Sequence, residues 1–237
     1  MIQDSFKIRA SSAYNFLSLP KLKRDRDAGL LSQTARNICD SYIIKNRYNY
    51  TDDLETNALL KGTINEEQSI SLVDILFPLE GINRIKNKER KETKYLSGEP
   101  DLVLPDKIEE IKSVWDVKSL YSKKNISKVY HTQVQVYMHL FGKEKATLYY
   151  CLTEMPREML LDEIFRLEKY HSDLSQYSIE EKTERFIENH RVQNVPLRER
   201  VRKFDVEYDP EVIQRLEEAH GRAVNYIANE INFLDGL

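Results

Sequence analysis

The first part of the chain carries apolar side chains at the spacing of helices. This pattern predicts helices over 11–19, over 32–46 with Ser32 as its cap, and over 54–77. From about residue 81 the pattern changes to short apolar runs broken by Gly and Pro, which are typical of strands. The predicted strands are, in order, GINRI, YLSG, DLVL and IEEIKSVW.

The rest of the pattern predicts one further strand among helices. TLYYCL at 147–152 is rich in residues that favour strands, and it follows a helix expected over 126–141. The chain then has a helical pattern from Pro156 to about 190 and an extended pattern over 200–208. A last amphipathic helix begins behind Pro210, because proline suits a first helical turn.

Length and composition agree with one folded domain. With 237 residues, 41% of them hydrophobic, the chain can bury a sizeable core. It has no internal repeat and no linker rich in Gly or Pro. We therefore expect an α/β protein with a single domain over 1–237, comprising a core at about 54–153 and a mainly helical C-terminal extension at about 156–237.

The sequence contains neither a membrane span nor a secretory signal. No apolar run is long enough to cross a bilayer, and the first residues lack the basic and then apolar pattern of a signal peptide. We therefore expect a cytoplasmic protein with no membrane partner. Cys39 and Cys151 are far apart and lie among apolar or aromatic residues, which predicts buried thiols rather than a disulfide framework, a zinc ribbon or a four-cysteine cluster.

The net charge of −3 argues weakly against a nucleic-acid partner, since proteins that bind phosphates usually have a basic surface. The charges are unevenly distributed, however. Acidic residues gather at 154–190, and basic residues cluster at 21–26, 86–94, 123–128 and 198–203. Each basic cluster alone is explained as a solvated face, so the clusters indicate nucleic acid only if they converge on one groove.

Candidate chemistry begins at SGEPD, where Gly98 and Pro100 introduce a strand that starts at Asp101. Taken alone, this is ordinary turn sequence. After DLVL, the residues from Pro105 to Lys107 predict a turn, and the chain returns as a second strand.

This hairpin brings two carboxylates and an amine together. If it is centred near residue 106, paired residue numbers sum to about 212, which places Asp101 opposite Ile111. Glu110 and Lys112 then flank that position and share one face of their strand. Two adjacent carboxylates repel one another, and a divalent cation is a common means of stabilising them. Oxygen ligands select Mg²⁺ or Mn²⁺.

A third carboxylate is predicted on the helix before the strands. Glu66 falls on the apolar, inward-facing stripe of the 54–77 helix, whereas Glu67 falls on its wet face. A carboxylate that faces a core must be paired or bound to metal. A partner lysine and a metal ion are both consistent with this position.

A second acid-x-lysine motif, Asp116-Val117-Lys118, competes for the role of Glu110 and Lys112. It lies about 17 Å farther along an extended strand than the position opposite Asp101. A bulge or a longer loop would be needed to bring it back. We therefore assign the site to Glu110 and Lys112 and keep the second motif as the alternative.

Taken in order, these motifs resemble the PD-(D/E)XK nuclease superfamily, specifically the phage exonucleases related to the lambda-type and YqaJ-type recombination enzymes. The resemblance covers residues 61–152, through the motifs KGTINEE, SGEPD, EIKSVWD and YHTQVQVYM. The last motif places Gln133 and Tyr137 at the spacing of the family's Q-x-x-x-Y helix.

The resemblance implies a restriction-endonuclease-like core, with a central mixed β-sheet flanked by helices, and hydrolysis of phosphodiester bonds. It implies that Mg²⁺, or Mn²⁺ in its place, is held by Glu66, Asp101, Glu110 and the carbonyl of Ile111. Lys112 would orient or deprotonate the attacking water. Substrate contacts would come from Gln133, Tyr137, Lys123, Lys124 and Lys128, although an amphipathic inner face explains Tyr137 equally well.

Departures from other nucleases of this superfamily favour the lambda-type enzymes as the model. RecB-type nucleases often carry a histidine ahead of the aspartate, but the first histidine here is His131, and the five histidines show no ligand spacing. The expected function is an exonuclease that processes double-stranded DNA ends. A structure- or site-specific endonuclease and a non-catalytic DNA-binding or assembly module are the alternatives. Candidate partners besides DNA are a single-strand annealing protein and further copies of the chain.

Overall fold

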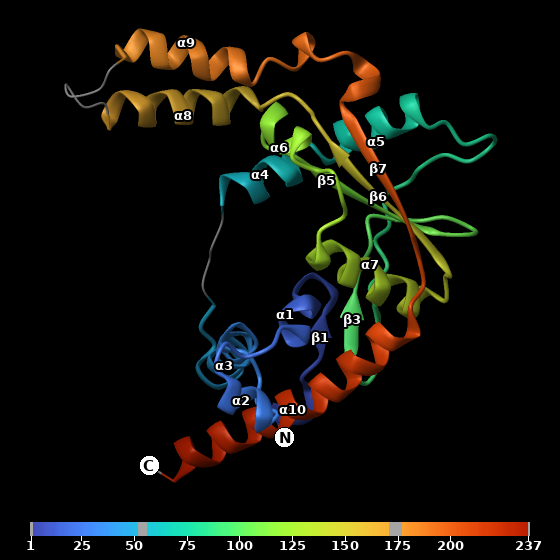
Figure 1. Cartoon of the computed structure of the whole chain (residues 1–237), viewed down its shortest axis with the longest axis vertical. Helices are drawn as coiled ribbons and strands as arrows, with labels where there is room; N and C mark the ends of the chain where they lie inside the picture. The colour runs from blue at the N-terminus through green and yellow to red at the C-terminus, as the bar shows by residue number, and fades with distance from the viewer. Residues whose placement is uncertain (1, 52–55, 171–176, 237) are drawn as a thin grey trace.

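The computed structural model describes residues 2–51, 56–170 and 177–236 and shows two mixed sheets flanked by helices (Figure 1). The larger sheet has the strand order β4-β5-β6-β7, and the smaller sheet has the order β1-β3-β2. The strands are β1 (Ile8–Arg9), β2 (Lys91–Glu92), β3 (Leu96–Gly98), β4 (Leu102–Val103), β5 (Ile108–Ser113), β6 (Lys145–Cys151) and β7 (Val201–Glu207). β5 and β6 are parallel, while β4 and β7 run antiparallel to their neighbours.

Ten α-helices lie within the described residues. They are α1 (Ala13–Leu17), α2 (Lys23–Asp27), α3 (Gln33–Tyr48), α4 (Asn57–Ile64), α5 (Glu66–Leu76), α6 (Val117–Tyr121), α7 (Lys128–Phe141), α8 (Arg157–Lys169), α9 (Ile179–Asn189) and α10 (Pro210–Asp235). No helix in this part of the chain is long and apolar enough to cross a membrane. The predicted fold class, a central mixed sheet flanked by helices with a helical C-terminal part, is confirmed.

The two faces of β5 point into different cores. Ile111 packs with Tyr149 and with Val73 of α5 on one face. Ile108, which points the other way, packs with residues of α7 and α10. Because successive side chains of a strand alternate between faces, the adjacent residues Glu109 and Glu110 must also point to opposite sides. This alternation gives the two glutamates different surroundings.

The N-terminal segment and α10 cover α7 from the side opposite the sheet. Buried side chains of α1, α3, α7 and α10 form one hydrophobic cluster, which includes Phe16, Ala35, Val134 and Leu216. α7 is therefore enclosed between the sheet and this helical layer, and eight of its residues are buried. The buried helix holds its polar residues in fixed positions against β5.

The prediction of one continuous helix over 54–77 is wrong, because α4 and α5 are separate helices that meet at Asn65. The buried Asn65 amide donates to Oγ1 of Thr153 at 2.9 Å and to the carbonyl of Glu154. Nζ of Lys61, on α4, donates to the carbonyls of Val114 and Trp115 at 3.0 and 2.8 Å. These contacts tie α4 to the ends of β5 and β6 instead of continuing one straight helix. Residues 54 and 55 lie outside the described residues.

Two other strand predictions need correction. GINRI at 81–85 forms no strand, because Arg84 turns inward to a buried glutamate and the backbone at Gly81 has a positive φ. The β4–β5 hairpin pairs Leu102 with Glu109 and Val103 with Ile108, so paired numbers sum to 211 rather than 212. The shift by one matters, since directly opposed residues share a face of the sheet and Asp101 therefore shares a face with Glu110.

The predicted helical stretch after Pro156 is observed as α8 and α9, and its residues 171–176 lie outside the described part. The extended segment over 200–208 is observed as β7, which pairs with β6 along seven residues. β1, β2, α2 and α6, each only two to five residues long, were not predicted.

Candidate active site

The β4–β5 hairpin presents Asp101 and Glu110 side by side. Its turn is closed by a hydrogen bond from the Leu104 amide to the Lys107 carbonyl at 2.9 Å. The Asp101 amide donates to Oε2 of Glu110 at 3.2 Å, and the Ile111 amide donates to Oδ2 of Asp101 at 2.8 Å. The backbone of each strand thus fixes the carboxylate of the other.

Burial and mutual repulsion act on this carboxylate pair. Glu110 is 1% exposed. Burial and then the charge of Glu110 raise the pKa of Asp101 to about 7, whereas the charge of Lys112 and the Ile111 amide act in the opposite direction. Two carboxylates held this close are stabilised by a proton or by a positive charge beside them.

Lys112 supplies one such charge. Its Nζ forms an ion pair with Oε1 of Glu110 and lies 5.3 Å from the ring centroid of Tyr130. Burial alone would lower the pKa of Lys112, but the charges of Glu110 and Asp101 outweigh it and hold that pKa above its usual range. Lys112 is therefore an ammonium that contacts a carboxylate on one side and an aromatic face on the other.

Gln133 and Tyr137 complete this group from α7. Nε2 of Gln133 donates to Oε1 of Glu110 at 3.1 Å and to the hydroxyl of Tyr137 at 2.7 Å. The Tyr137 ring packs over Gly98, where an added Cβ would lie 2.8 Å from Cε1 of the ring. The glycine of SGEPD is therefore required by the tyrosine of the Q-x-x-x-Y motif, a link that spacing alone did not reveal.

Glu66 stands at the first residue of α5 and forms an ion pair with Lys86. The pKa of Lys86 is raised by its hydrogen bond to Glu66 first, and also by the charges of Asp101 and Glu99, which act against the effect of burial. Lys86 thus pairs with Glu66 and is close enough to Asp101 and Glu99 for their charges to act on it. The sequence placed Lys86 only in a basic cluster and gave no signal of this contact.

No three of the His, Cys, Asp and Glu side chains described are grouped closely enough to hold a metal as they stand. Asp101 and Glu110 are adjacent, and Glu66 is directed to Lys86. The expected metal ligation by Glu66, Asp101, Glu110 and the Ile111 carbonyl therefore stays a prediction.

Glu109 is buried on the other face of β5 and has a structural network that sequence reasoning missed. It is 0% exposed and accepts from Nε of Arg84 at 2.6 Å and from the Tyr149 hydroxyl at 3.0 Å. Lys107 forms an ion pair with it at 2.7 Å. Arg84 also bonds Asp74 at 2.7 Å. Glu109 thus anchors α5 to the sheet, whereas its neighbour Glu110 lies in the candidate active site.

The alternative motif is placed elsewhere. Asp116 is the N-cap of α6, and its Oδ1 accepts from the Ser119 amide at 2.7 Å. Burial acts to raise the pKa of Asp116, but the hydrogen bonds from Ser119 outweigh it and lower that pKa. Lys118 is exposed on the same short helix. This geometry gives Asp116 a capping role and leaves Glu110 and Lys112 beside Asp101.

The expected DNA-contacting lysines border the same region. Lys123 Nζ lies 5.3 Å from the ring centroid of Tyr150, and Lys124 Nζ lies 5.7 Å from that of Tyr121. Lys128 is exposed at the first residue of α7. These positions lie around the N-terminal end of the helix that carries Gln133.

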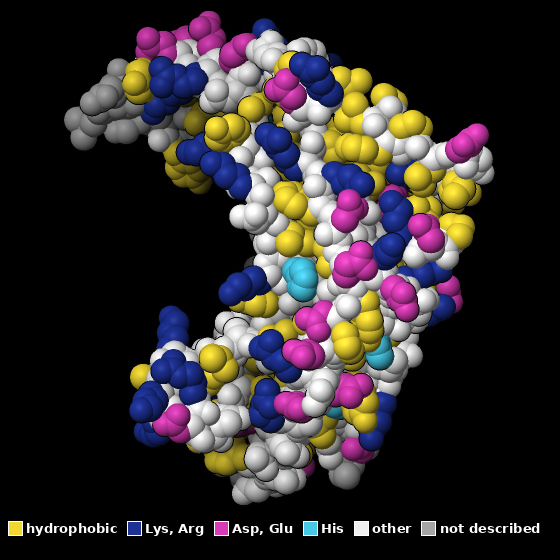
Figure 2. Space-filling model, turned by 45° about the vertical axis from the view of Figure 1, so that its right-hand side comes forward, with side chains coloured by type: hydrophobic (Ala, Val, Ile, Leu, Met, Phe, Trp, Pro, Cys, Tyr) yellow, Lys and Arg dark blue, Asp and Glu magenta, His cyan; other side chains and the backbone are white. Residues whose placement is uncertain are grey.

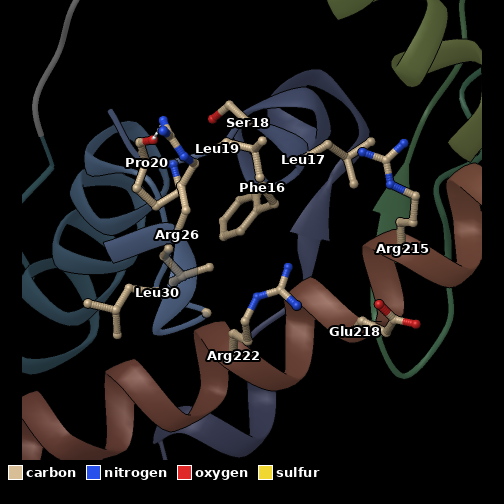
Figure 3. A pocket seen from close by; sticks show the side chains of 12 residues that line it. Phe16, Leu17, Ser18, Leu19, Pro20, Arg26, Leu30, Arg215, Glu218 and Arg222 are labelled. Atoms are coloured by element: carbon tan, nitrogen blue, oxygen red, sulfur yellow. Dashed lines mark hydrogen bonds between the residues drawn. The ribbon is translucent and has the colours of Figure 1, made fainter. Parts of the chain in front are cut away.

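A pocket of about 240 Å³ lies away from the carboxylates, between α1, α2 and α10 (Figure 3). Phe16 lies in its interior, and the guanidinium groups of Arg26, Arg215 and Arg222 surround it together with Glu218. Nη1 of Arg26 donates to the carbonyls of Pro20 and Lys21 at 3.1 and 3.0 Å. This pocket contains none of the residues expected in the active site.

Three of the solved structures with a similar fold are structures of exonucleases. A phage-related exonuclease from Haemophilus somnus 129PT has a TM-score of 0.75 and 25% identity, covering 97% of this chain and 96% of that one. An alkaline exonuclease from Laribacter hongkongensis has a TM-score of 0.62 and 13% identity, covering 97% and 91%. Its complex with dAMP has a TM-score of 0.59 and 14% identity, covering 96% and 91%.

No protein-family model matches the chain, and a search of curated proteins gives no match. The resemblance to phage-type exonucleases that the motifs indicated is confirmed by the solved structures, along nearly the whole chain.

Proposed function

We propose that this chain is a metal-dependent exonuclease that degrades double-stranded DNA from its ends during phage or prophage recombination. The observation that carries the proposal is the buried pair Asp101 and Glu110 with the ammonium of Lys112 beside it. This group lies in a fold shared with two solved exonucleases, one of them phage-related. The match to the phage-related enzyme covers almost the full length of both chains.

The donor set fits a divalent cation. Asp101 and Glu110 offer carboxylate oxygens only, which suit Mg²⁺ or Mn²⁺. A cation would relieve the repulsion that, together with burial, raises the pKa of Asp101 to about 7. These two residues would hold the metal with the Ile111 carbonyl. Glu66 would join them in exchange for its ion pair with Lys86.

Bound Mg²⁺ would supply positive charge and favour the hydroxide form of a bound water. The ammonium of Lys112 would donate to the attacking water or to the phosphate oxygens and stabilise their developing charge. Gln133 would hold the orientation of Glu110 through the 3.1 Å hydrogen bond. The dAMP held by the solved alkaline exonuclease suggests that mononucleotides are the products here as well.

A DNA surface is supported by the charge pattern. The molecule is concave on one side, and Lys and Arg side chains lie on both arms of this concave side, interspersed with Asp and Glu side chains (Figure 2). The arms are formed by α8 and α9 at one end and by the N-terminal helices at the other (Figure 1). Lys123, Lys124 and Lys128 would contact phosphates without reading bases. A chain of net charge −3 can therefore bind DNA through a locally basic face.

The deciding experiment compares an end-labelled linear duplex with a closed circular duplex of the same sequence. We expect Mg²⁺ or Mn²⁺ to support release of mononucleotides from the linear substrate only. EDTA should abolish release, and Ca²⁺ should allow binding with little turnover, because its looser coordination positions the water poorly. Purified Lys112→Ala protein is the matched control for contaminating nuclease.

Two outcomes would reassign the function. Cleavage of the closed circle would identify a structure- or site-specific endonuclease on the same fold. DNA binding without cleavage, under every metal condition, would leave a non-catalytic binding or assembly module. Release that continues in EDTA would contradict the metal-dependent mechanism. Self-association and a single-strand annealing partner stay predictions for which co-purification is the test.

A further inference from the structure

A hollow of about 370 Å³ lies between the segment after β5 and the start of β7. It is lined by Tyr121, Lys123, Lys124, Arg202, Lys203 and Phe204. Two basic clusters that are far apart in the sequence, at 123–128 and 198–203, thus meet at one place. Convergence of such clusters distinguishes a binding surface from separate solvated faces.

Three of the four basic residues that line this hollow have no acidic partner among the described residues. Its lining has four basic residues and no acidic one. Because side chains alternate along β7, Lys203 points to the other face from Arg202, where it pairs with Asp205 at 3.1 Å, so its charge does not face the hollow. Within the described part of the chain, Lys123, Lys124 and Arg202 make no salt bridge of 4 Å or less, so their charges can act on a ligand. A ligand for this site must carry negative charge at more than one point.

Two aromatic side chains lie among these cations. Tyr121 is 68% exposed, and Nζ of Lys124 lies 5.7 Å from its ring centroid. Phe204 packs edge-on against Tyr150, with ring centroids 5.8 Å apart. An exposed aromatic ring beside unpaired cations contributes little to folding. The same arrangement suits nucleic acid without a second strand, whose bases stack on rings while its phosphates contact the cations.

The hollow is on the same face of the sheet as the candidate active site. Lys112 of β5 pairs with Tyr150 of β6, and Tyr150 pairs with Arg202 of β7. Paired residues on adjacent strands share a face, and two strand spacings amount to about 10 Å. Arg202 therefore lies about 10 Å across the sheet from Lys112.

Aromatic rings join the two places on this face. Lys112 Nζ lies 5.3 Å from the Tyr130 ring centroid, and the centroids of Tyr130 and Tyr150 are 5.8 Å apart. Lys123 Nζ lies 5.3 Å from the Tyr150 centroid. A row of packed rings, with the buried Tyr150 at its centre, thus connects Lys112 to the hollow, and β6 is the only strand between them.

We propose that this hollow binds a single-stranded segment of the DNA substrate next to the cleavage site, with a base stacked on Tyr121 and phosphates at Arg202 and Lys124. The proposal rests on the proposed function, because it takes DNA as the substrate. It adds a binding site for single-stranded DNA, and hydrolysis at Asp101 and Glu110 does not by itself require such a site. A duplex, whose bases are already stacked in pairs, cannot use the exposed ring in this way.

The test measures binding of a fluorescently labelled single-stranded oligonucleotide and of a blunt duplex by polarisation, in EDTA so that no cleavage occurs. Tyr121→Ala should weaken single-strand binding at least about fivefold, the scale of one lost base stack. Arg202→Gln should weaken it and reduce the slope of its salt dependence by about 0.7. Duplex affinity should change by less than about twofold in Tyr121→Ala, since stacking on a single base is absent there.

Two variants serve as controls. Tyr121→Phe keeps the ring and should retain single-strand affinity. Arg222→Gln removes one charge from the separate pocket beside α10 and should leave single-strand binding unchanged. Equal weakening by Arg222→Gln and Arg202→Gln would overturn the proposal, because net charge alone would then explain the effect.

The remaining outcomes separate this proposal from the proposed function. If Tyr121→Ala and Arg202→Gln both leave the single-strand affinity unchanged, the proposed binding site is wrong. The proposed cleavage of duplex DNA would not be affected by that result. Equal loss of duplex and single-strand affinity in Tyr121→Ala would also overturn it. A protein that shows the predicted binding losses but never cleaves DNA would contradict only the nuclease function.

Discussion

Gln133 of α7 donates a hydrogen bond from Nε2 to Oε1 of Glu110 on β5, at 3.1 Å, although the two residues are 23 positions apart. Both are buried, and the same Nε2 reaches the hydroxyl of Tyr137 at 2.7 Å. Residues that orient a metal-binding carboxylate in this way commonly determine how well the metal is held. The pairing therefore gives the Q-x-x-x-Y motif a measurable role.

Gln133→Leu keeps a side chain of similar size but removes both hydrogen bonds. We expect the Mg²⁺ concentration for half-maximal nuclease activity to rise about 10- to 100-fold, the usual range for lost outer partners of a ligand. Initial rates against Mg²⁺ concentration measure this. Tyr137→Phe keeps the ring over Gly98 and leaves the hydrogen bond from Gln133 to Glu110 in place. The Mg²⁺ concentration for half-maximal activity should therefore rise less in this variant. Equal shifts in the two variants would contradict the role assigned to the Gln133–Glu110 contact.

Replacements at the two acid-x-lysine motifs should have unequal effects. Glu110→Gln and Lys112→Ala should each lower turnover at least about a hundredfold, the scale of removing one stabilising group from a charged transition state. Asp116→Asn should have a mild effect, because Asp116 caps α6 through the Ser119 amide. Single-turnover rates at saturating Mg²⁺ give the ranking. Inactive Asp116→Asn beside active Glu110→Gln would move the site to the second motif.

Lys86 should compete with a metal for Glu66. Lys86→Met removes the ion pair and should tighten Mn²⁺ binding to the protein alone by up to about fivefold, since exposed pairs contribute about 0.2–1 kcal/mol. Glu66→Gln should weaken Mn²⁺ binding instead. Titration calorimetry without DNA measures both. Weaker Mn²⁺ binding in Lys86→Met would show that Lys86 does not compete with the metal for Glu66.

Lys61 provides a prediction about stability and pH. It is 2% exposed, and burial lowers its pKa to about 8 while the charge of Asp116 acts to raise it. The unfolded chain, with an ordinary lysine, binds more protons than the folded chain between about pH 8 and pH 10.5. The contribution of Lys61 to the free energy of unfolding should therefore increase as the pH rises through this range.

The measurement is urea unfolding of the wild type and of Lys61→Met at pH 8 and pH 10. The difference in stability between them should shift by about 2 kcal/mol in favour of the wild type at the higher pH. Other groups that titrate here, such as buried tyrosines, affect both proteins and cancel in the difference. A difference that is the same at both pH values would mean that Lys61 stays charged in the folded protein.

The grouping of most candidate site residues could be predicted from sequence, because these residues are local to one hairpin and one helix. Asp101, Glu110 and Lys112 are brought together by a turn of two residues, and Gln133 and Tyr137 by one turn of α7. The error of one in the hairpin register arose because Pro105 and Asp106 alone form the loop, which shifts the centre by half a residue. The hydrophobic period and the turn residues predict the register of a hairpin only to within about one residue.

The contacts that escaped prediction are those between elements distant in sequence. Glu109 and Glu110 are chemically identical neighbours, and only the packing of α5 on one face and α7 on the other separates the anchor from the site residue. Arg84 was wrongly predicted to lie in a strand. The local sequence could not show that its side chain turns inward to Glu109, 25 positions later. The ion pair of Glu66 with Lys86 likewise has no local signature.

The place of β7 in the sheet has a consequence for how the protein is made. β6 is paired on one side with β5 and on the other with β7, whose residues come about 50 positions later in the chain. Until β7 has left the ribosome, β6 presents a long unpaired edge that can join another chain. A fragment that ends after residue 153 should therefore aggregate rather than fold. The candidate site, although all its residues precede residue 153, would then be held in place only once β7 completes the sheet.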